Sequence, residues 1–171
     1  RLALTLVAIL AVAPLWQSVR VLDALYVGTD AAALFSGTLS RDEYLAHRLA
    51  YYPAAQWLNA HTDKGAHVLY LGETRLLYVD RQVTLASAYD AAHFDRLLAV
   101  GAPPLWTVLK SLGVTHILIN GREIDRLRSS YDYLTLTSEG ERQLRAELHR
   151  CRIVFRQSGV QLCEIPSPEV S

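Results

Sequence analysis

The first stretch of the chain is a long apolar run, and its length limits what this part of the protein can form. Residues 2–19 carry no charged side chain. A helix of this length approaches the ~30 Å thickness of a bilayer's hydrocarbon core, at a rise of about 1.5 Å per residue. The chain begins at Arg1 and contains no methionine. We therefore expect residues 1–26 to be the last transmembrane helix of a longer protein.

Two other interpretations of the apolar run remain open at this stage. A signal peptide would need a small-residue cleavage site, and residues 11–13 (Ala-Val-Ala) have that pattern, but Pro14 would then follow the cut directly. A helix buried in a protein core can also be apolar throughout. A membrane helix tolerates Pro14, because neighbouring helices satisfy the freed carbonyl, and Trp16 stands where an interfacial aromatic is expected. We favour the membrane helix.

The composition sets limits on the rest of the chain. Of its 171 residues, 51% are hydrophobic, which is enough for a sizeable core and excludes a disordered chain. Lysine and arginine together number 17, as do aspartate and glutamate, so the formal net charge is zero. A nucleic-acid-binding domain normally carries an excess of basic residues, and we therefore expect no nucleic-acid partner.

Apolar runs and helix signals alternate along the chain after the first segment. Ser40 and Glu43 form a capping box, and Ser138 and Glu141 suggest a second, so helices are expected over 41–48 and 138–150. Pro53 favours a helix to His61. Further helices are expected over 92–100, 103–112 and 123–129, and strands over 67–71, 83–86 and 115–120, followed by a hairpin over 152–165.

This alternation predicts an α/β fold. The early strands are apolar throughout, which is typical of a parallel sheet that is covered on both faces. We expect a small three-layer α/β domain over residues 51–166, with a mainly parallel sheet and a C-terminal β-hairpin. Residues 27–50 would form a connecting helical segment, and residues 167–171 a tail.

The two cysteines flank the predicted hairpin. Cys151 and Cys163 do not have the spacing of metal ligands. If the turn centres near Ser158, they stand diagonally across the hairpin, so a disulfide and two free thiols both remain open. We favour two partly buried free thiols, because an unpaired cysteine behaves as a small apolar residue.

Polar residues follow several of the predicted strands, and ligands in open α/β sheets bind at the carboxyl ends of strands. The candidates are Glu73, Arg75, Asp80, Arg81, Asp90, Asn120, Glu123 and Arg126. Gly72 is the one glycine in the segment 71–75, so a dinucleotide fingerprint and a phosphate-binding loop are absent. Local ion pairs, a helix cap by Asn120 and a tight turn with positive φ at Gly72 are the simplest roles.

No cofactor, metal or catalytic motif stands out. The six histidines are dispersed along the chain, whereas a metal site needs three or four convergent ligands. The chain has no G-x-S-x-G, and neither cysteine has a catalytic signature around it. We expect no cofactor, no metal and no catalytic residue within these 171 residues.

Several segments together resemble a known family. They are Tyr-Pro at 52–53, VLYLGETR at 68–75, YVDR at 78–81, Tyr-Asp at 89–90, LGVTHILIN at 112–120, and E-x-x-R-L-x-x-x-Y at 123–131. In this order they resemble the C-terminal extracytoplasmic domain of bacterial polytopic membrane glycosyltransferases, the mannosyltransferase-like and aminoarabinose-transferase-like proteins. The resemblance covers residues 2–165.

The resemblance implies a function for the parent protein. It would move a sugar from a polyprenyl-phosphate donor to a lipid, protein or glycan acceptor, with its catalytic carboxylate in an upstream loop that this chain does not contain. The domain would be accessory, on the periplasmic side of the bacterial inner membrane, beside membrane lipid. Its eight candidate residues would be structural or face the acceptor. The alternatives are a non-enzymatic binding or assembly domain of a membrane protein, and a stand-alone soluble α/β enzyme.

Overall fold

The computed structural model describes residues 12, 14–24, 29–86, 90–99, 101–131 and 133–165. The chain divides into two compact units, residues 1–49 and residues 50–171. The expected tail, residues 167–171, lies outside the described residues.

The first unit contains three helical segments among its described residues. Residues 14–24 are helical, and they are followed by α2 (Ala31–Phe35) and α3 (Arg41–Arg48). About half of the expected transmembrane helix over 1–26, namely residues 1–11, 13, 25 and 26, lies outside the described ranges. Among the residues that are described, no helix is both long enough and apolar enough to cross a membrane.

The capping box that opens α3 is confirmed. The Oγ of Ser40 accepts a hydrogen bond from the Glu43 amide at 3.2 Å, and Oε2 of Glu43 accepts one from the Ser40 amide at 2.9 Å. Two amide donors that the first helical turn leaves without partners are thereby satisfied. The helix begins and ends where the sequence predicts.

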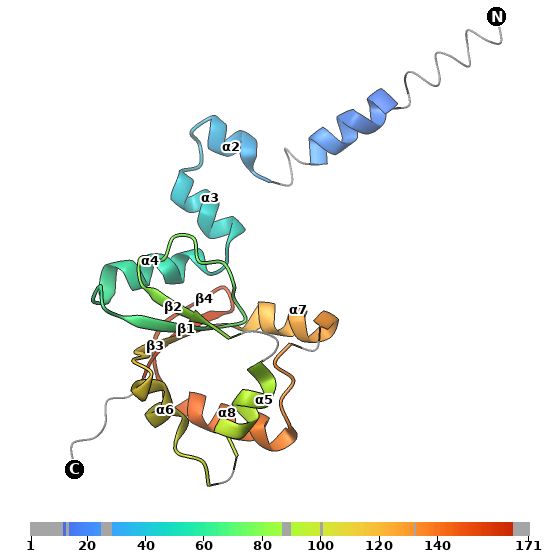
Figure 1. The fold of residues 1–171 in the computed structure, drawn as a ribbon. Helices are drawn as coiled ribbons and strands as arrows, with labels where there is room; N and C mark the ends of the chain where they lie inside the picture. The colour runs from blue at the N-terminus through green and yellow to red at the C-terminus, as the bar shows by residue number, and fades with distance from the viewer. Residues whose placement is uncertain are drawn as a thin grey trace, which may run out of the picture. The chain divides into compact units, whose positions relative to one another are not determined.

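The second unit is built on a five-stranded sheet in the order β2-β1-β3-β5-β4 (Figure 1). Its strands are β1 (His67–Leu71), β2 (Gln82–Leu85), β3 (His116–Asn120), β4 (Arg152–Gln157) and β5 (Val160–Glu164). The pairs β1–β2 and β1–β3 are parallel, whereas β3–β5 and β4–β5 are antiparallel. The prediction of a mainly parallel sheet was wrong, because the C-terminal hairpin joins directly onto β3 and makes the sheet mixed. The hairpin itself is confirmed.

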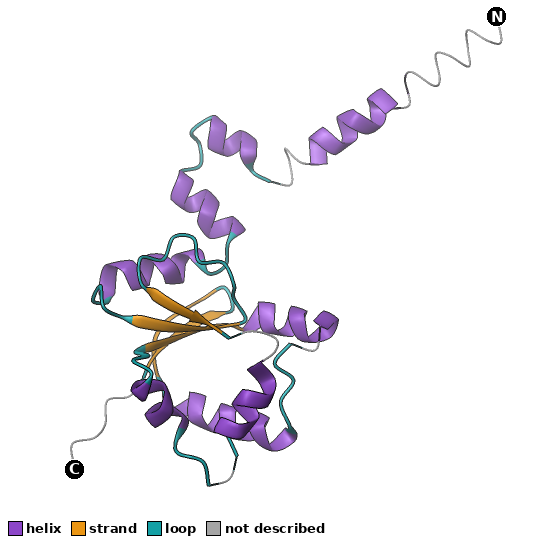
Figure 2. Cartoon of the chain, in the orientation of Figure 1, coloured by secondary structure: helices purple, strands orange, loops and turns teal. Residues whose placement is uncertain are grey.

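Helices cover both faces of the sheet, as expected for an α/β fold (Figure 2). One face carries α4 (Tyr52–His61), and the other carries α5 (Ala91–Leu97), α6 (Leu105–Ser111) and α8 (Ser138–Arg150). Side chains alternate along β1: Leu69 and Leu71 belong to the core cluster on the α6 side, and Val68 and Tyr70, fully buried, face the other way. Both faces of β1 are covered by helices, which explains why the strand is apolar on both faces.

The cap of α8 and the starts of α6 and α7 differ from their predictions. The helix α6 begins at Leu105, two residues after the predicted start. The eighth helix, α8, is capped by Thr137, whose Oγ1 accepts a hydrogen bond from the Gly140 amide at 3.1 Å. The backbone of Thr137 is extended, as an N-cap requires, so Ser138 already lies inside the helix. The helix α7 (Gly121–Tyr131) begins directly after β3, two residues before the predicted start.

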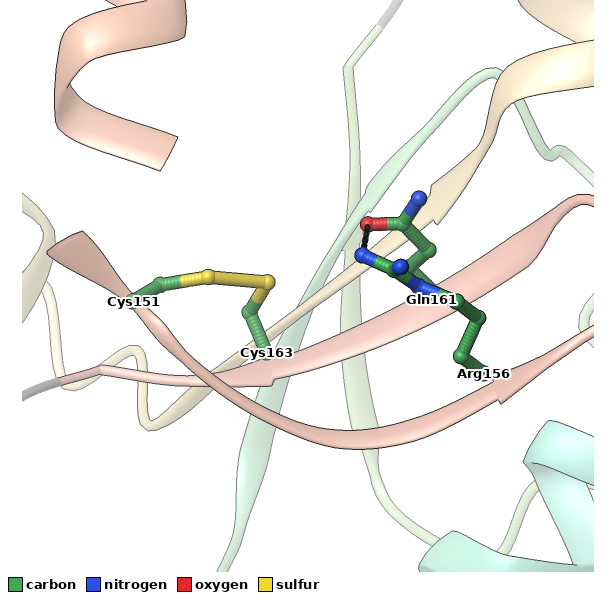
Figure 3. The surroundings of a disulfide bond; sticks show 4 residues. All are labelled: Cys151, Arg156, Gln161 and Cys163. Atoms are coloured by element: carbon green, nitrogen blue, oxygen red, sulfur yellow. Dashed lines mark hydrogen bonds between the residues drawn. A yellow bond between two sulfur atoms is a disulfide. The ribbon is translucent and has the colours of Figure 1, made fainter. Parts of the chain in front are cut away.

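The two cysteines form a disulfide (Figure 3), so the prediction of free thiols was wrong. Cys163 pairs with Ile153 in the register of the hairpin, which places Cys151 diagonally across from it, as expected from a turn near Ser158. The two Cα atoms are 5.7 Å apart, a separation that a disulfide spans readily. The bond ties the end of α8 to β5.

Candidate functional site

The chain connections that leave the carboxyl ends of β1 and β3 run in opposite directions across the sheet. After β1 the chain runs to β2 on one side, and after β3 it continues through α7 and α8 to the hairpin on the other side. In open α/β sheets this topological switch point is where ligands bind, because the diverging connections leave a crevice between the two strand ends. Glu73 follows β1 by two residues, and Asn120 is the last residue of β3.

Glu73 is the centre of this site. It is 2% exposed, and its carboxylate accepts hydrogen bonds on both oxygens. Oε1 accepts from the amides of Thr74 and Arg75 at 3.0 Å, and Oε2 accepts from Nδ2 of Asn120 at 3.0 Å. The last of these bonds joins the two strand ends directly.

The Arg75 side chain completes the shell around that carboxylate. Its Nε and Nη2 donate to the two oxygens of Glu73 at 2.8 and 2.7 Å, in the two-pronged geometry that suits a carboxylate. Burial alone would raise the pKa of Glu73, but the hydrogen bonds from Arg75 and Asn120 outweigh it and hold that pKa below its ordinary value. Glu73 is therefore ionised and fully engaged, so its role is to position Arg75 and not to carry protons.

Arg75 itself remains partly open to solvent. Its side chain is 44% exposed, and its guanidinium carbon lies 5.1 Å from the centre of the Tyr51 ring, a cation–π contact. Within the described residues, Nη1 of Arg75 makes no hydrogen bond to protein. The buried glutamate and the aromatic ring thus hold the guanidinium in place while one edge of it stays available to a partner.

The first turns of α7 add a second glutamate–arginine pair. The Glu123 amide donates to Oδ1 of Asn120 at 3.3 Å, so Asn120 caps the helix as predicted while also binding Glu73. Arg126 donates to Glu123 from Nε at 2.9 Å and from Nη2 at 2.5 Å. This hydrogen bonding, and after it the positive charges of Arg126 and Arg75, lowers the pKa of Glu123. We call Glu73, Arg75, Asn120, Glu123 and Arg126 the strand-end cluster.

A buried tyrosine braces the backbone beneath the cluster. The hydroxyl of Tyr133 accepts a hydrogen bond from the Gly72 amide at 2.9 Å and donates one to the Ala86 carbonyl at 2.9 Å. It therefore links the segments that follow β1 and β2. Asp90, at the start of α5, lies near enough to raise the pKa of Tyr133, in addition to the larger effect of burial. Gly72 has a φ of +73°, as predicted.

Two of the predicted site residues lie at the other end of the sheet. Asp80 and Arg81 precede β2, whose first residue pairs with the first residue of β1. Arg81 donates from Nη2 to the carbonyls of Asn59 and Thr62 at 2.8 Å each, and so caps the C-terminus of α4. The Asp80 amide donates to Oδ1 of Asn59 at 2.9 Å. These two residues hold the 72–81 connection against α4 and are not part of the strand-end cluster.

Three tyrosines near the cluster were not among the predicted site residues. Tyr133 approaches from a segment far along the chain, and Tyr51 and Tyr70 are both fully buried. The Tyr51 hydroxyl donates to the Leu77 carbonyl at 2.9 Å, whereas the fully buried Tyr70 hydroxyl has no partner within the described residues. Burial, and then the nearby Tyr51 and Glu73, raise the pKa of Tyr70, so it stays protonated.

The described part of the chain holds no group of three or more histidine, cysteine, aspartate or glutamate side chains placed to bind a metal ion. The strand-end cluster instead offers two guanidinium edges and a helix start, which are suited to binding and orienting a polar partner. No protein-family model, no curated protein and no solved structure matches this chain.

Proposed function

We propose that this chain is the accessory extracytoplasmic part of a membrane-bound glycosyltransferase, and that its strand-end cluster faces the acceptor. The observation that carries the proposal is the half-exposed Arg75 guanidinium, held by the buried Glu73 at the switch point of the sheet. In this arrangement a buried carboxylate holds one cation in a fixed position. A fixed guanidinium serves recognition of a polar partner better than it serves proton transfer.

The link to sugar transfer rests on the resemblance of segments 68–75 and 112–120 to membrane glycosyltransferases that use polyprenyl-phosphate sugars. These two segments contain most of β1 and all of β3, and the resembling residues include Glu73, Arg75 and Asn120 of the cluster. The chemistry would take place in the upstream part of the parent protein, on the lipid-linked donor. The domain described here would then orient the lipid, protein or glycan that receives the sugar.

The periplasmic location also has support from the second unit. The Cys151–Cys163 disulfide is typical of a protein in an oxidising compartment, since cytoplasmic thiols are kept reduced. In a bacterium, the periplasmic side of the inner membrane is such a compartment. The transmembrane helix that we expect over 1–26 would anchor the domain beside that membrane.

A transfer assay on the complete reading frame in membranes tests the proposal. The donor would be a radiolabelled polyprenyl-phosphate sugar, and the acceptor concentration would be varied. We expect Arg75→Ala to raise the KM for acceptor by about tenfold, the loss of one charge-assisted contact, with kcat and the KM for donor unchanged. The matched control is Arg156→Ala on β4, whose side chain binds only Gln161 among the described residues.

Three outcomes would overturn the proposal. The absence of transfer from every polyprenyl-phosphate donor would favour a non-enzymatic binding or assembly domain. Transfer that survives alanine substitution of each acidic residue in the first extracytoplasmic loop would contradict the expected place of the catalytic carboxylate. An Arg75→Ala enzyme whose acceptor KM equals that of Arg156→Ala would leave the strand-end cluster with a structural role alone.

A further inference from the structure

A second polar surface lies at the opposite end of the sheet from the strand-end cluster. It is a groove of about 980 Å³ whose lining comes from the C-terminal end of α4, the turn that follows it, and the strands β3, β4 and β5. The strand-end cluster contributes no residue to it. None of the eight polar residues predicted from the sequence lines it either.

The floor of the groove is a row of three polar side chains. His116 pairs with Glu164 across β3 and β5, and Glu164 pairs with Arg152 across β5 and β4. Residues that are paired in register project from the same face of a sheet, so the three side chains stand side by side. Arg152 and Glu164 also form an ion pair. The row therefore offers an imidazole, a carboxylate and a guanidinium within the width of three strands.

The wall of the groove is aromatic. Trp57 and His61 lie one turn apart on α4, and their rings stack with centroids 4.7 Å apart and planes 11° from parallel. Nδ1 of His61 is 2.9 Å from the Trp57 carbonyl oxygen, which fixes the imidazole against the indole. Trp57 is half-buried, so part of a large and rigid aromatic surface remains open to the groove.

The charges of the lining favour an uncharged ligand. The groove has two carboxylates, Asp63 and Glu164, against one guanidinium, Arg152. Burial, and then the charge of Arg152, lower the pKa of His116, so its imidazole is neutral at neutral pH. A phosphate or carboxylate ligand would meet a slight excess of negative charge here. A purely apolar ligand would leave the polar row without partners, which costs free energy.

We propose that this groove is a saccharide-binding site for a neutral pyranose or a short neutral glycan. A pyranose ring presents a face of C–H groups that packs on an aromatic ring, and its edge carries hydroxyl groups that both donate and accept hydrogen bonds. Trp57 supplies the aromatic surface. Glu164 accepts hydroxyl hydrogen bonds, Arg152 donates them, and His116 has its Nε2 left for one, since Nδ1 lies 2.8 Å from the Thr115 hydroxyl.

This inference stands on the groove and does not require that the parent protein transfers sugars. If the proposed function also holds, the two surfaces give the domain two points of contact with a glycan acceptor, at opposite ends of one sheet. The experiment must therefore separate the groove from the strand-end cluster.

Ligand-observed NMR on the full 171-residue chain provides the test. The sample would be kept in a zwitterionic detergent, because detergents with a sugar headgroup would compete for the groove. Maltose, cellobiose, methyl α-D-mannopyranoside and methyl β-D-galactopyranoside are the probes, and sorbitol is the control that has hydroxyl groups but no pyranose ring. We expect saturation transfer to at least one probe, with a dissociation constant on the order of 1 mM, and none to sorbitol.

Amide chemical-shift mapping on the unaltered chain locates the bound sugar. We expect shifts near Trp57, His116 and Glu164 and none near Glu73. Substituting Trp57→Ala should weaken binding by about tenfold or more, because an aromatic anchor is lost. Arg152→Gln tests whether the guanidinium in the floor of the groove contributes to saccharide binding. Arg126→Ala changes only the strand-end cluster and should bind the saccharide normally.

Three results would overturn the inference: no saturation transfer to any of the four saccharides, equal transfer to sorbitol, or shifts that map away from the groove. Saccharide binding that Arg126→Ala abolishes and Trp57→Ala spares would move the site to the strand-end cluster. If Trp57→Ala does not fold, as judged by circular dichroism, the shift map and Arg152→Gln still decide the question.

Discussion

Gly72 should tolerate no side chain, and substituting it with alanine gives the most direct test of the geometry beneath the strand-end cluster. Its φ of +73° lies in the left-handed region, which costs an L residue about 1–2 kcal/mol. A Cβ atom at this position would also overlap Cγ1 of Ile124 and stand 2.8 Å from the carbonyl oxygen of Asn120. Neither neighbour is the free end of a flexible side chain, so α7 or the end of β3 would have to shift.

The expected loss follows from these two effects. Overpacking of this kind costs about 1–3 kcal/mol in addition to the backbone strain. Replacing glycine also lowers the entropy of the unfolded chain, which returns about 0.4–1 kcal/mol. We therefore expect Gly72→Ala to lower the free energy of unfolding by about 2–4 kcal/mol.

Gly113→Ala is the matched control. Its φ is +77°, but the nearest atom to its Cβ, Nδ1 of His67, is 3.8 Å away, which is an ordinary contact. This variant should show the backbone strain alone and lose about 1 kcal/mol or less. Urea unfolding followed by circular dichroism, with linear extrapolation to water, measures both losses on one scale.

A double-mutant cycle isolates the contact with Ile124. Ile124→Ala removes the overlapping atom, so adding Gly72→Ala to that background should cost less than it costs in the natural chain. The steric argument is refuted if Gly72→Ala loses no more stability than Gly113→Ala. An unchanged stability in both variants would refute the positive φ as well.

Three further predictions concern the second unit. Because folding lowers the pKa of Glu73, its ionised carboxylate stabilises the folded chain. This stabilisation is complete above the ordinary pKa of 4.5 and is lost as the pH falls below that value. Melting temperatures measured on both sides of pH 4.5 should therefore fall less steeply with decreasing pH in Glu73→Gln than in the natural chain. Arg81→Ala should lower the unfolding free energy by about 1–3 kcal/mol through loss of the α4 cap, against almost no change in Arg156→Ala by the same urea assay. Reducing the disulfide of Cys151 and Cys163 should cost about 2–4 kcal/mol, and iodoacetamide should label neither cysteine in the unfolded, unreduced chain.

Elements with strong local signals could be predicted from the sequence. The strand β1 is a short apolar run that Gly65 and Gly72 bound on either side, and the capping box at Ser40 places the start of α3. Their stabilising contacts lie within a few residues or depend on burial alone. The order of the strands could not be predicted from local sequence, because no residue pattern within the hairpin indicates that β5 pairs with β3.

The strand-end cluster was partly predictable for the same reason. Glu73 and Asn120 each follow an apolar strand, and parallel strands bring their carboxyl ends to one edge. Tyr133 could not be found in this way, since it bonds to backbone groups 61 and 47 residues away. Arg81 is a candidate in the sequence because it is charged. Its cap on α4 depends on hydrogen bonds to the carbonyls of Asn59 and Thr62, which lie in an earlier part of the chain.

The edge strand β4 has a consequence for how this protein meets other chains. Its free edge carries the exposed Arg152 and Arg156, and its pairing with β5 is irregular between Ile153 and Phe155. Charges and irregular pairing on an edge obstruct the addition of a further strand from another molecule. This edge of the sheet is thereby protected against edge-to-edge aggregation at high local concentration. Peptide capture by strand addition is disfavoured here too, so a partner that meets the β4 edge has to be recognised by side chains.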